Sequence, residues 1–571
     1  MATRSRCSTS TLSDHVVAST TPALVDAAAN RFGDAEALVD GDVRLSFREL
    51  AAEVRAAAKG FLAAGVTRGD RVAIWAPNMW EWVVAAFGAQ TAGAAIVPLN
   101  TRFKGHEAAD ILLRSRAKVL CCVNGFLAND YPAMLAATGI DLPDLEYVVE
   151  FRSATSPTRE VAPGHDGHDL TRTPRRQGWE EFVGAGSSVT DTQVDAAAEA
   201  VRPSDLSDII FTSGTTGRPK GVMCSHHQTI KAFEAWTEVI GLAEGDRYLI
   251  VNPFFHTFGY KAGFLSCLIR GATIIPEPVF DVDKVLTKAA AERVSMLPGP
   301  PTLYLSILAH PNRGDYDLST LRLAVTGAAA IPVELIRRMR KELTFTTIVT
   351  GYGLTESTGV ISMCRAGDDP EVIALTSGRA IPEVEMRVVD DDNVEVPAGQ
   401  PGEVVARGYN IMRGYLDDPV ATAEAIDADG WLHTGDIGWV DEAGYVRITD
   451  RKKDMFIVGG FNAYPAEIEN ALLSYPGVAQ VAVVGVPDDR MGEVGAAYVI
   501  TRPGESVEPE AMIAWARERM ANYKVPRLVH LVDSLPMNAT GKVLKYELRQ
   551  AIAAAARSGK TLETLAVSQS P

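Results

Sequence analysis

Apolar and polar positions alternate along the first part of the chain in a way that predicts parallel α/β sheets. Up to about residue 350, segments of helical length separate short β-branched runs, which read RVAIWAP, AAIVPL, KVLCCV, RYLIVNP, ATIIPEP and RLAVTGA. Strands that alternate with helices indicate parallel sheets. The most apolar long stretch, residues 82–97, falls short of the roughly 20 residues that a membrane span needs. It favours a helix that runs into a buried strand, so we expect no membrane anchor.

The pattern changes in the last third of the chain. Residues 376–449 hold short strands separated by Gly and Asp turns, which predict an antiparallel β subdomain with hairpins. After ITDRKKD the pattern becomes α+β, with helices expected at 465–474 and 508–520 and strands at AQVAVVGVP and near 497–501. The predicted organisation is α/β, with a large N-terminal domain over 1–449, a hinge at 450–453, a small mobile α+β C-terminal domain over 454–557 and a disordered tail over 558–571.

Composition narrows the classes of function. Hydrophobic residues make up 47% and charged residues 22% of the 571 residues, as in soluble globular proteins. The net charge of −17 argues against binding to nucleic acid, so any anionic substrate must be held by local charges. Six scattered cysteines without a C-x-x-C pair favour a reducing, cytoplasmic compartment. A polar segment rich in Pro, Gly and charge, residues 153–176, predicts a mobile surface insertion.

The segment FTSGTTGRPKG, residues 211–221, has the composition of a phosphate-binding loop. Its glycines allow close backbone approach, its hydroxyls donate hydrogen bonds, and successive N–H groups in such a turn form an anion site. The P-loop motif requires G-x-x-x-x-G-K-[ST], but here Lys220 is followed by Gly221 and Val222. We therefore predict that the loop binds phosphate in a different fold.

Further motifs join this loop. TGYGLTES, residues 350–357, places an aromatic ring, a hydroxyl and a carboxylate close together after an apolar strand. WLHTGD ends in Asp436, a carboxylate suited to a diol such as ribose, and DRKKDMFIVGGFNAYPAEIE opens the second domain. LPMNATGK presents Lys542 on a Gly-containing turn.

In this order and spacing, the motifs resemble those of the adenylate-forming superfamily of acyl-CoA synthetases, adenylation domains and luciferases. The resemblance extends from about residue 20 to residue 550. It implies a two-step reaction with ATP, Mg²⁺ and coenzyme A, in which a carboxylate forms an acyl-adenylate and a thiol then displaces AMP.

The resemblance also assigns roles to residues. Lys542 would stabilise the charge that develops in the transition state, while Thr355 and Glu356 would contact the α-phosphate, with Glu356 holding Mg²⁺. Lys453 would be the hinge, and Gly459 and Gly460 would line the path of pantetheine. The ATP-binding residues would be Thr212, Ser213, Gly214, Thr215, Thr216, Gly217, Lys220, Gly327, Ala328, Ala329, Tyr352, Gly353, Asp436 and Arg451.

The acyl pocket is expected in segments 252–263 and 297–304 together with the 327–329 turn. His256 would lie at its gate and contribute to catalysis, with a buried core histidine as the alternative. Aromatic and proline residues predict an apolar cavity. The expected lining residues are His256, Thr257, Phe258, Tyr260, Lys261, Pro298, Gly299, Pro300, Thr302 and Gly353.

The amino-acid sequences of these segments are similar to those of actinobacterial ligases that activate a bicyclic propanoate derived from steroid rings. Medium- or long-chain fatty acids and cyclic or aryl carboxylates are the alternative substrates. An adenylation enzyme that loads a carrier protein is expected to continue into a carrier domain, whereas this sequence stops at Pro571. A luciferase activity stays open, because fold alone does not settle function. A homodimer is also possible.

Overall fold

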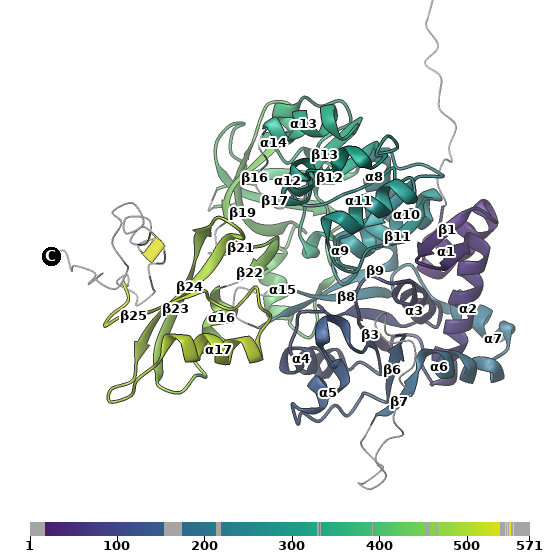
Figure 1. Cartoon of the computed structure of the whole chain (residues 1–571), viewed down its shortest axis with the longest axis horizontal. Coiled ribbons are helices and arrows are strands. Elements are labelled where there is room, and N and C mark those ends of the chain that lie inside the picture. Colours follow the sequence, from purple (N-terminus) through teal and green to yellow (C-terminus); the bar gives the residue numbers. More distant parts are fainter. Residues whose placement is uncertain are drawn as a thin grey trace, which may run out of the picture.

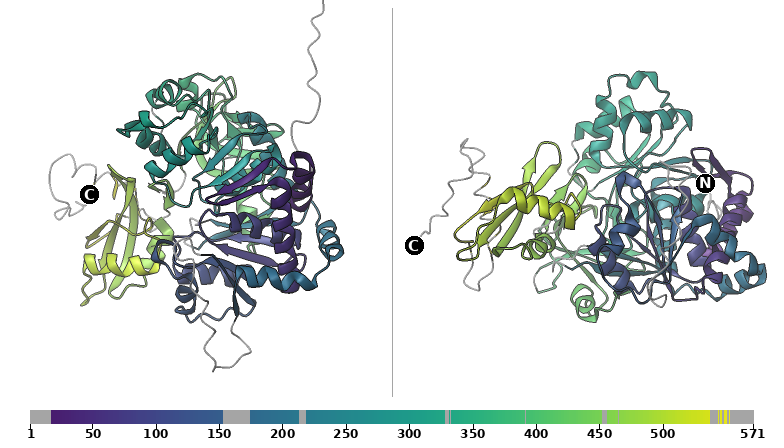
Figure 2. Two further views of the ribbon diagram at one scale, coloured as in Figure 1. Left: turned by 45° about the vertical axis from the view of Figure 1, so that its right-hand side comes forward. Right: turned by 60° about the horizontal axis from the view of Figure 1, so that its bottom comes forward.

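The structure, a computed structural model, describes residues 17–152, 174–212, 218–327, 331, 333–390, 392–451, 456–463, 465–536, 543, 545, 548–549 and 552, with the backbone alone at 449–451, 462, 466 and 470. The described elements form a large N-terminal domain and a smaller C-terminal domain that lie side by side (Figures 1 and 2). Each domain has hydrophobic clusters of its own. The predicted mixed α/β fold is confirmed.

The first sheet of the N-terminal domain has the strand order β18-β9-β8-β4-β3-β5-β6-β7. It is parallel from β8 to β7 and antiparallel where β9 and β18 join it. Strand β5 reads VLCCV and is buried along its whole length, as expected for a parallel strand covered on both faces. The strands are β3 (Arg71–Trp75), β4 (Ala95–Pro98), β5 (Val119–Val123), β6 (Tyr147–Phe151), β7 (Arg175–Gly178), β8 (Leu206–Thr212), β9 (Lys220–Ser225) and β18 (Gly414–Tyr415).

The second sheet joins two groups of strands, β10-β11-β1-β2 and β12-β13-β14-β15. Met296 links them through parallel bridges to Tyr248 and Leu323. The ends of these strands give rise to the segments that the sequence predicts for the acyl pocket and adenine. The strands are β1 (Glu36–Asp40), β2 (Val43–Ser46), β10 (Arg247–Ile250), β11 (Thr273–Pro276), β12 (Leu323–Thr326), β13 (Thr347–Tyr352), β14 (Ser362–Met363) and β15 (Arg379–Ala380).

Helices surround these sheets (Figure 1). Helix α3 is apolar around its circumference because it is buried on all sides, packed against α1 and α2. The helices are α1 (Thr21–Phe32), α2 (Phe47–Ala63), α3 (Trp80–Thr91), α4 (Gly105–Ser115), α5 (Tyr131–Ala136), α6 (Trp179–Ala185), α7 (Asp191–Ala200), α8 (His226–Ile240), α9 (Thr257–Gly259), α10 (Ser266–Arg270), α11 (Val282–Ala291), α12 (Pro301–Ala309), α13 (Val333–Glu342), α14 (Pro370–Leu375) and α15 (Pro419–Ala425). A π-helix, η3 (Tyr260–Leu265), and the 3₁₀ segments η1 (Phe126–Ala128), η2 (Gly186–Ser188), η4 (Arg313–Asp315) and η5 (Thr355–Ser357) complete this set.

The predicted antiparallel subdomain is the sheet β16-β17-β19-β20, formed by β16 (Val384–Val389), β17 (Gly402–Gly408), β19 (Leu432–Val440) and β20 (Val446–Arg451). The C-terminal domain contains a second such sheet, β22-β21-β24-β23, and β25 pairs with β24 in parallel. Its elements are β21 (Phe456–Val458), β22 (Phe461–Ala463), α16 (Pro465–Leu472), β23 (Val478–Asp488), β24 (Gly492–Thr501), α17 (Pro509–Arg519) and β25 (Leu528–Leu531).

The expectation that residues 153–176 form a mobile insertion is wrong at its end. Arg175 and Arg176 belong to β7, an edge strand that pairs with β6, and Arg176 forms an ion pair with Glu150 at 2.6 Å. Gln177 is the buried position of this strand, so its sequence lacks the apolar signal of a central strand. Residues 153–173 and 558–571 lie outside the described part of the chain.

A buried histidine makes stability depend on pH. Nδ1 of His226, at the start of α8, accepts a hydrogen bond from the backbone N–H of Thr21 at 3.2 Å, which requires a neutral ring. Burial lowers its pKa from 6.5 to about 4. Because the folded-state pKa is the lower one, the stabilisation is complete above pH 6.5 and is lost as the pH falls towards 4.

As the pH falls through that window, we expect His226 to lower the free energy of unfolding by about 1.4 kcal/mol per pH unit. The measurement is thermal unfolding at a series of pH values, for the native chain and for His226→Asn, which keeps an acceptor but cannot titrate there. The variant should show a shallower decline, and identical slopes would contradict the assignment.

Candidate functional site

The predicted phosphate loop connects two antiparallel strands. Thr212 ends β8 and pairs with Lys220, which begins β9. The base of the loop is held by α4, where Asp110 forms an ion pair with Arg218 at 2.9 Å and Arg114 donates to the carbonyl of Pro219 at 2.5 Å. A neighbouring helix therefore fixes one end of the loop.

Strand β18 brings a tyrosine between the loop and the TGYGLTES motif. It pairs with β9, and the Tyr415 hydroxyl donates to Oε1 of Glu356 at 2.9 Å. On the same ring, Nζ of Lys220 lies 4.8 Å from the centroid, within cation–π range. Tyr415 thus contacts Glu356 and Lys220, two residues that the sequence predicts for the site. Thr355, a third predicted residue, directly precedes Glu356 in η5.

The residues predicted for the adenosine part of ATP also come together. The Tyr352 hydroxyl donates to Oδ2 of Asp436 at 2.6 Å, and Asp436 is the cross-strand partner of Arg451. Beside them, a Cβ on Gly353 would lie 2.5 Å from Cα of Val360, which permits only glycine. Gly327 has more room, since its nearest neighbour would be 3.3 Å away.

A buried asparagine holds the end of β10 and the segment that follows it through three hydrogen bonds to their backbone. Asn78 donates to the carbonyls of Ile250 and Asn252 at 3.0 and 2.9 Å and accepts from the N–H of Phe254 at 2.7 Å. Asn252 in turn donates to the carbonyl of Pro298 at 3.4 Å. The two segments predicted for the acyl pocket are therefore neighbours.

His256 presents a neutral ring. Its Nδ1 accepts from the N–H of Phe258 at 3.2 Å. The residue is exposed to solvent, and the surrounding protein lowers its pKa below the ordinary value. Thr257, next in sequence, lies against Gly359. A Cβ added to Gly359 would be 3.1 Å from the Cβ of Thr257. The acyl segment thus contacts the turn that follows Glu356.

Lys261 takes part in an ion pair from which solvent is excluded. Its Nζ lies 2.8 Å from Oδ1 of Asp208 on β8, and neither side chain has any exposed surface. Burial alone lowers the pKa of Lys261, but Asp208 and Cys224 together outweigh it and leave the pKa above its ordinary value. Oδ2 of Asp208 accepts from Ser207 and from Thr229 of α8.

The remaining predicted residues differ in their exposure. Tyr260 is fully buried, and its hydroxyl accepts from Gln90 at 2.9 Å. Pro298 and Gly299 are buried, Pro300 and Phe258 are half-buried, and Thr302 is exposed. The contacts of these residues with a substrate stay a prediction.

Gly459 and Gly460 form the turn between β21 and β22, with φ of 56° and 84°. A Cβ on Gly459 would lie 2.6 Å from Cε of Met491, whereas one on Gly460 would meet nothing within 4 Å. The predicted residues Ser213, Gly214, Thr215, Thr216, Gly217, Ala328, Ala329, Lys453 and Lys542, and the side chain of Arg451, lie outside the described part.

Sequence reasoning missed Tyr415, Asn78 and Asp208. Tyr415 reaches the site because β18 adds to the edge of β9, a long-range pairing that no local pattern reveals. Asn78 and Asp208 are buried polar residues, and their partners Phe254 and Lys261 lie far away in the sequence. No motif in the sequence marks these three residues.

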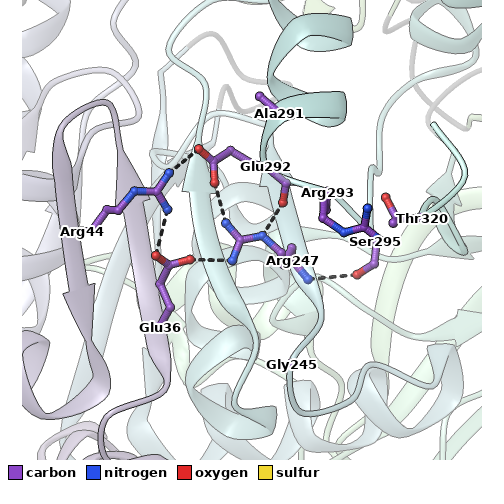
Figure 3. Close-up of a pocket in the computed structure, with 9 residues that line it drawn as sticks. All are labelled: Glu36, Arg44, Gly245, Arg247, Ala291, Glu292, Arg293, Ser295 and Thr320. Atoms are coloured by element: carbon purple, nitrogen blue, oxygen red, sulfur yellow. Dashed lines mark hydrogen bonds and ion pairs between the residues drawn. The ribbon is translucent and has the colours of Figure 1, made fainter. Parts of the chain in front are cut away.

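Two surface hollows lie elsewhere. The first, of about 490 Å³, contains a ring of alternating charges formed by Arg44, Glu36, Arg247 and Glu292 (Figure 3). These charges neutralise one another and tie the β1–β2 hairpin to β10 and to the end of α11. The second hollow, of about 780 Å³, is lined by Trp431, whose ring centroid lies 3.8 Å from the guanidinium of Arg387 and 4.5 Å from that of Arg407. Neither hollow is lined by a residue predicted for the site.

The described part of the chain lacks the features of a membrane-spanning helix and of a cluster of metal ligands. No described helix combines the length and the apolar character that a bilayer crossing requires. The described side chains also hold no cluster of three or more His, Cys, Asp or Glu suited to a metal.

Two family models match the chain. The model of the AMP-binding enzyme covers residues 25–416, and that of the AMP-binding enzyme C-terminal domain covers residues 467–542. The chain is also 50% identical to 3-[(3aS,4S,7aS)-7a-methyl-1,5-dioxo-octahydro-1H-inden-4-yl]propanoyl:CoA ligases from Rhodococcus jostii RHA1 and Mycobacterium tuberculosis H37Rv. Each alignment covers 93% of this chain and 98% of the relative.

Solved structures agree with this result. An o-succinylbenzoate CoA synthetase double mutant from Bacillus subtilis, bound to a CoA product analogue, has a TM-score of 0.74 at 26% identity, over 92% of this chain and 98% of that chain. The synthetase from the same organism in complex with its acyl-adenylate has a TM-score of 0.60 at 26% identity, over 92% and 97%.

The buried Asp208–Lys261 pair gives a prediction about stability. Lys261→Met leaves an unpaired buried carboxylate and should destabilise the N-terminal domain by about 3–5 kcal/mol. Lys59→Met, which breaks an ion pair with exposed Asp191, should change stability by less than about 1 kcal/mol. Denaturant unfolding measures both.

A double variant separates the loss of the pair from the loss of packing. Adding Asp208→Asn to Lys261→Met removes the unpaired charge while keeping an acceptor for Ser207 and Thr229. The double variant should therefore be more stable than Lys261→Met alone. If it is no more stable, the unpaired charge is not the cause of the loss.

Proposed function

The chain belongs to the AMP-binding enzyme family, and we propose that it is an AMP-forming acid–thiol ligase whose acid is the steroid-derived 3-(7a-methyl-1,5-dioxo-octahydro-inden-4-yl)propanoate. The observation that carries the proposal is 50% identity, over nearly the full length of both chains, to two relatives that bear this activity in their names. ATP and coenzyme A are its co-substrates.

In the first step a carboxylate oxygen of the acid attacks the α-phosphorus of ATP. The bond to the bridging oxygen breaks, and pyrophosphate leaves with the electron pair. The loop between β8 and β9 and Lys220 would hold the departing phosphates, while Asp436 and Arg451 would bind the ribose. Lys542 would bridge the acid and the α-phosphate, where charge increases in the transition state.

Glu356 is the residue that would hold Mg²⁺. One of its carboxylate oxygens accepts from Tyr415, which fixes the orientation of the group, and the other oxygen would bind the ion. A single carboxylate together with substrate phosphates is a usual environment for Mg²⁺. When bound, the ion neutralises phosphate charge.

In the second step the thiolate of coenzyme A attacks the acyl carbon. The carbon–oxygen bond to AMP breaks, and AMP leaves. A rotation about the 450–453 hinge would withdraw Lys542 and bring the Gly459–Gly460 turn to the path of pantetheine. The open space around Gly460 is consistent with this role. A neutral His256 ring, whose Nδ1 accepts from the backbone N–H of Phe258, would place no positive charge beside an apolar acyl group.

We also propose a cytoplasmic location. The five described cysteines are free thiols in buried positions, which fits a reducing compartment. A homodimer stays a prediction.

The test of the proposed function is mass detection of acyl-CoA after incubation with ATP, Mg²⁺ and coenzyme A. Five acids would be compared, namely the bicyclic propanoate, octanoate, palmitate, benzoate and cinnamate. Strong preference for the bicyclic acid supports the proposal, and turnover of chain or aryl acids instead would retain the ligase and reject the substrate. Lys542→Ala, with its fold retained, is the control that should form no adenylate.

Tyr415→Phe should weaken the use of Mg²⁺. Without the hydroxyl, Glu356 loses the bond that orients it, and we expect adenylation at limiting Mg²⁺ to fall about 10- to 100-fold. Pyrophosphate exchange at a series of Mg²⁺ concentrations measures this effect.

Tyr409→Phe is the matched control. The Tyr409 ring also carries a lysine, with Nζ of Lys231 at 4.5 Å, and its hydroxyl donates to the carbonyl of Pro382 rather than to a carboxylate. Equal effects of the two substitutions on the Mg²⁺ dependence would contradict the role given to Tyr415.

A further inference from the structure

A buried lysine lies where the two domains meet. Lys524 belongs to the C-terminal domain and is 2% exposed. Its Nζ lies 2.6 Å from Oε1 of Glu467 in the same domain and 2.7 Å from Oε1 of Glu107 on α4 of the N-terminal domain. Burial alone lowers the pKa of Lys524, but the carboxylates outweigh it and raise the pKa well above the ordinary value. One ammonium group therefore joins carboxylates from both domains.

Aromatic side chains enclose this contact. The Lys524 ammonium lies 4.8 Å from the ring centroid of Phe103, which belongs to the N-terminal domain. Phe461 and Tyr523 of the C-terminal domain stack at 4.9 Å, and the guanidinium of Arg102 lies 4.4 Å from the Phe461 ring. The surface from Arg102 to Glu107 therefore receives the residue that directly follows the Gly459–Gly460 turn.

The arrangement of the domains can be compared with solved structures that hold different ligands. At equal identity and nearly equal coverage, the Bacillus synthetase matches this structure better with a CoA product analogue bound than with an acyl-adenylate bound. A whole-chain TM-score depends on the arrangement of the two domains as well as on their folds, so the higher score favours the arrangement found with the CoA analogue for the contacts of Lys524.

We propose that Lys524 and Glu107 are positioning residues that hold the C-terminal domain in the orientation for thioester formation. The inference rests on the proposed two-step ligase function. In this orientation the cross-domain ion pair is shielded from water, where it is stronger than at the surface. The pair favours this orientation because it cannot form when the domains separate.

The same three residues allow the contact to open. When the C-terminal domain rotates away, Lys524 keeps Glu467, so neither is left as an unpaired buried charge. Glu107 then enters solvent, where its charge is hydrated. The lysine thus has a partner in both orientations, which suits a contact that must form and break in each catalytic cycle.

Two substitutions test the proposal as a matched pair. Glu107→Gln and Glu467→Gln each remove one negative charge from the same ammonium group at nearly the same distance, but only Glu107 lies across the domain boundary. The first should shift the domains away from the observed orientation, and the second should leave that orientation populated.

The first measurement needs no substrate. Spin labels are attached at two exposed helix positions, through Leu113→Cys on α4 and Glu510→Cys on α17. Pulsed electron paramagnetic resonance then measures the distance between the domains. Cys7 is replaced by serine, and the five described cysteines are buried. Glu107→Gln should lower the population at the distance of this structure relative to Glu467→Gln. Equal distributions in the two variants would overturn the proposal, whether or not any acid is activated.

The second measurement separates the half-reactions. Single-turnover release of pyrophosphate reports adenylation, and transfer of preformed acyl-adenylate to coenzyme A reports the second step. Glu107→Gln should slow the second step about tenfold, within the usual range of coupling between conformation and activity, and leave the first within about twofold. Equal losses in both steps, or the same selective loss in Glu467→Gln, would overturn the proposal. Failure to adenylate any acid would instead reject the proposed function.

Discussion

The ion pair between Asp208 and Lys261 is the constraint on which the N-terminal part of the site depends. Asp208 lies on the strand that leads into the phosphate loop, and Lys261 lies on the π-helix that continues the acyl segment. Oδ2 of the same carboxylate is bonded to Thr229 of α8. Since a buried charge must stay paired, these elements cannot move independently without a large loss of free energy. The pair therefore keeps the segment predicted to bind the acid in a fixed relation to the strand that leads into the predicted phosphate loop.

The sequence predicts the parts of the site that depend on local chemistry. The meeting of Tyr352 with Asp436, and the location of Lys220 at the base of a glycine-rich loop, follow motifs whose residue types suit ATP. Tyr415 and Asn78 could not be predicted, because each acts through partners that are distant along the chain. A buried asparagine or tyrosine looks the same in a sequence whatever it contacts. Only the pairing of strands and the packing of loops give these residues their roles.

The same distinction holds for the fold. Strands such as β5 and β12 were predicted because buried parallel strands require continuous apolar runs. Strand β7 was missed because it lies at an edge, where one buried residue suffices. Strand β24 begins at Gly492, earlier than the expected 497, because it pairs with β23 along their whole shared length. Pairing partners, more than the residues of a strand, determine where it starts.

Helix α4 has a consequence for the timing of the cycle. It carries Glu107, which contacts the C-terminal domain, and Asp110, which contacts the base of the phosphate loop. These residues are three positions apart, about one helical turn or 4.5 Å along the axis. A helix is stiff over such a length, so a displacement of one residue is transmitted to the other. In the proposed reaction, the departure of pyrophosphate and the arrival of the C-terminal domain would therefore act on neighbouring turns of one short, rigid helix.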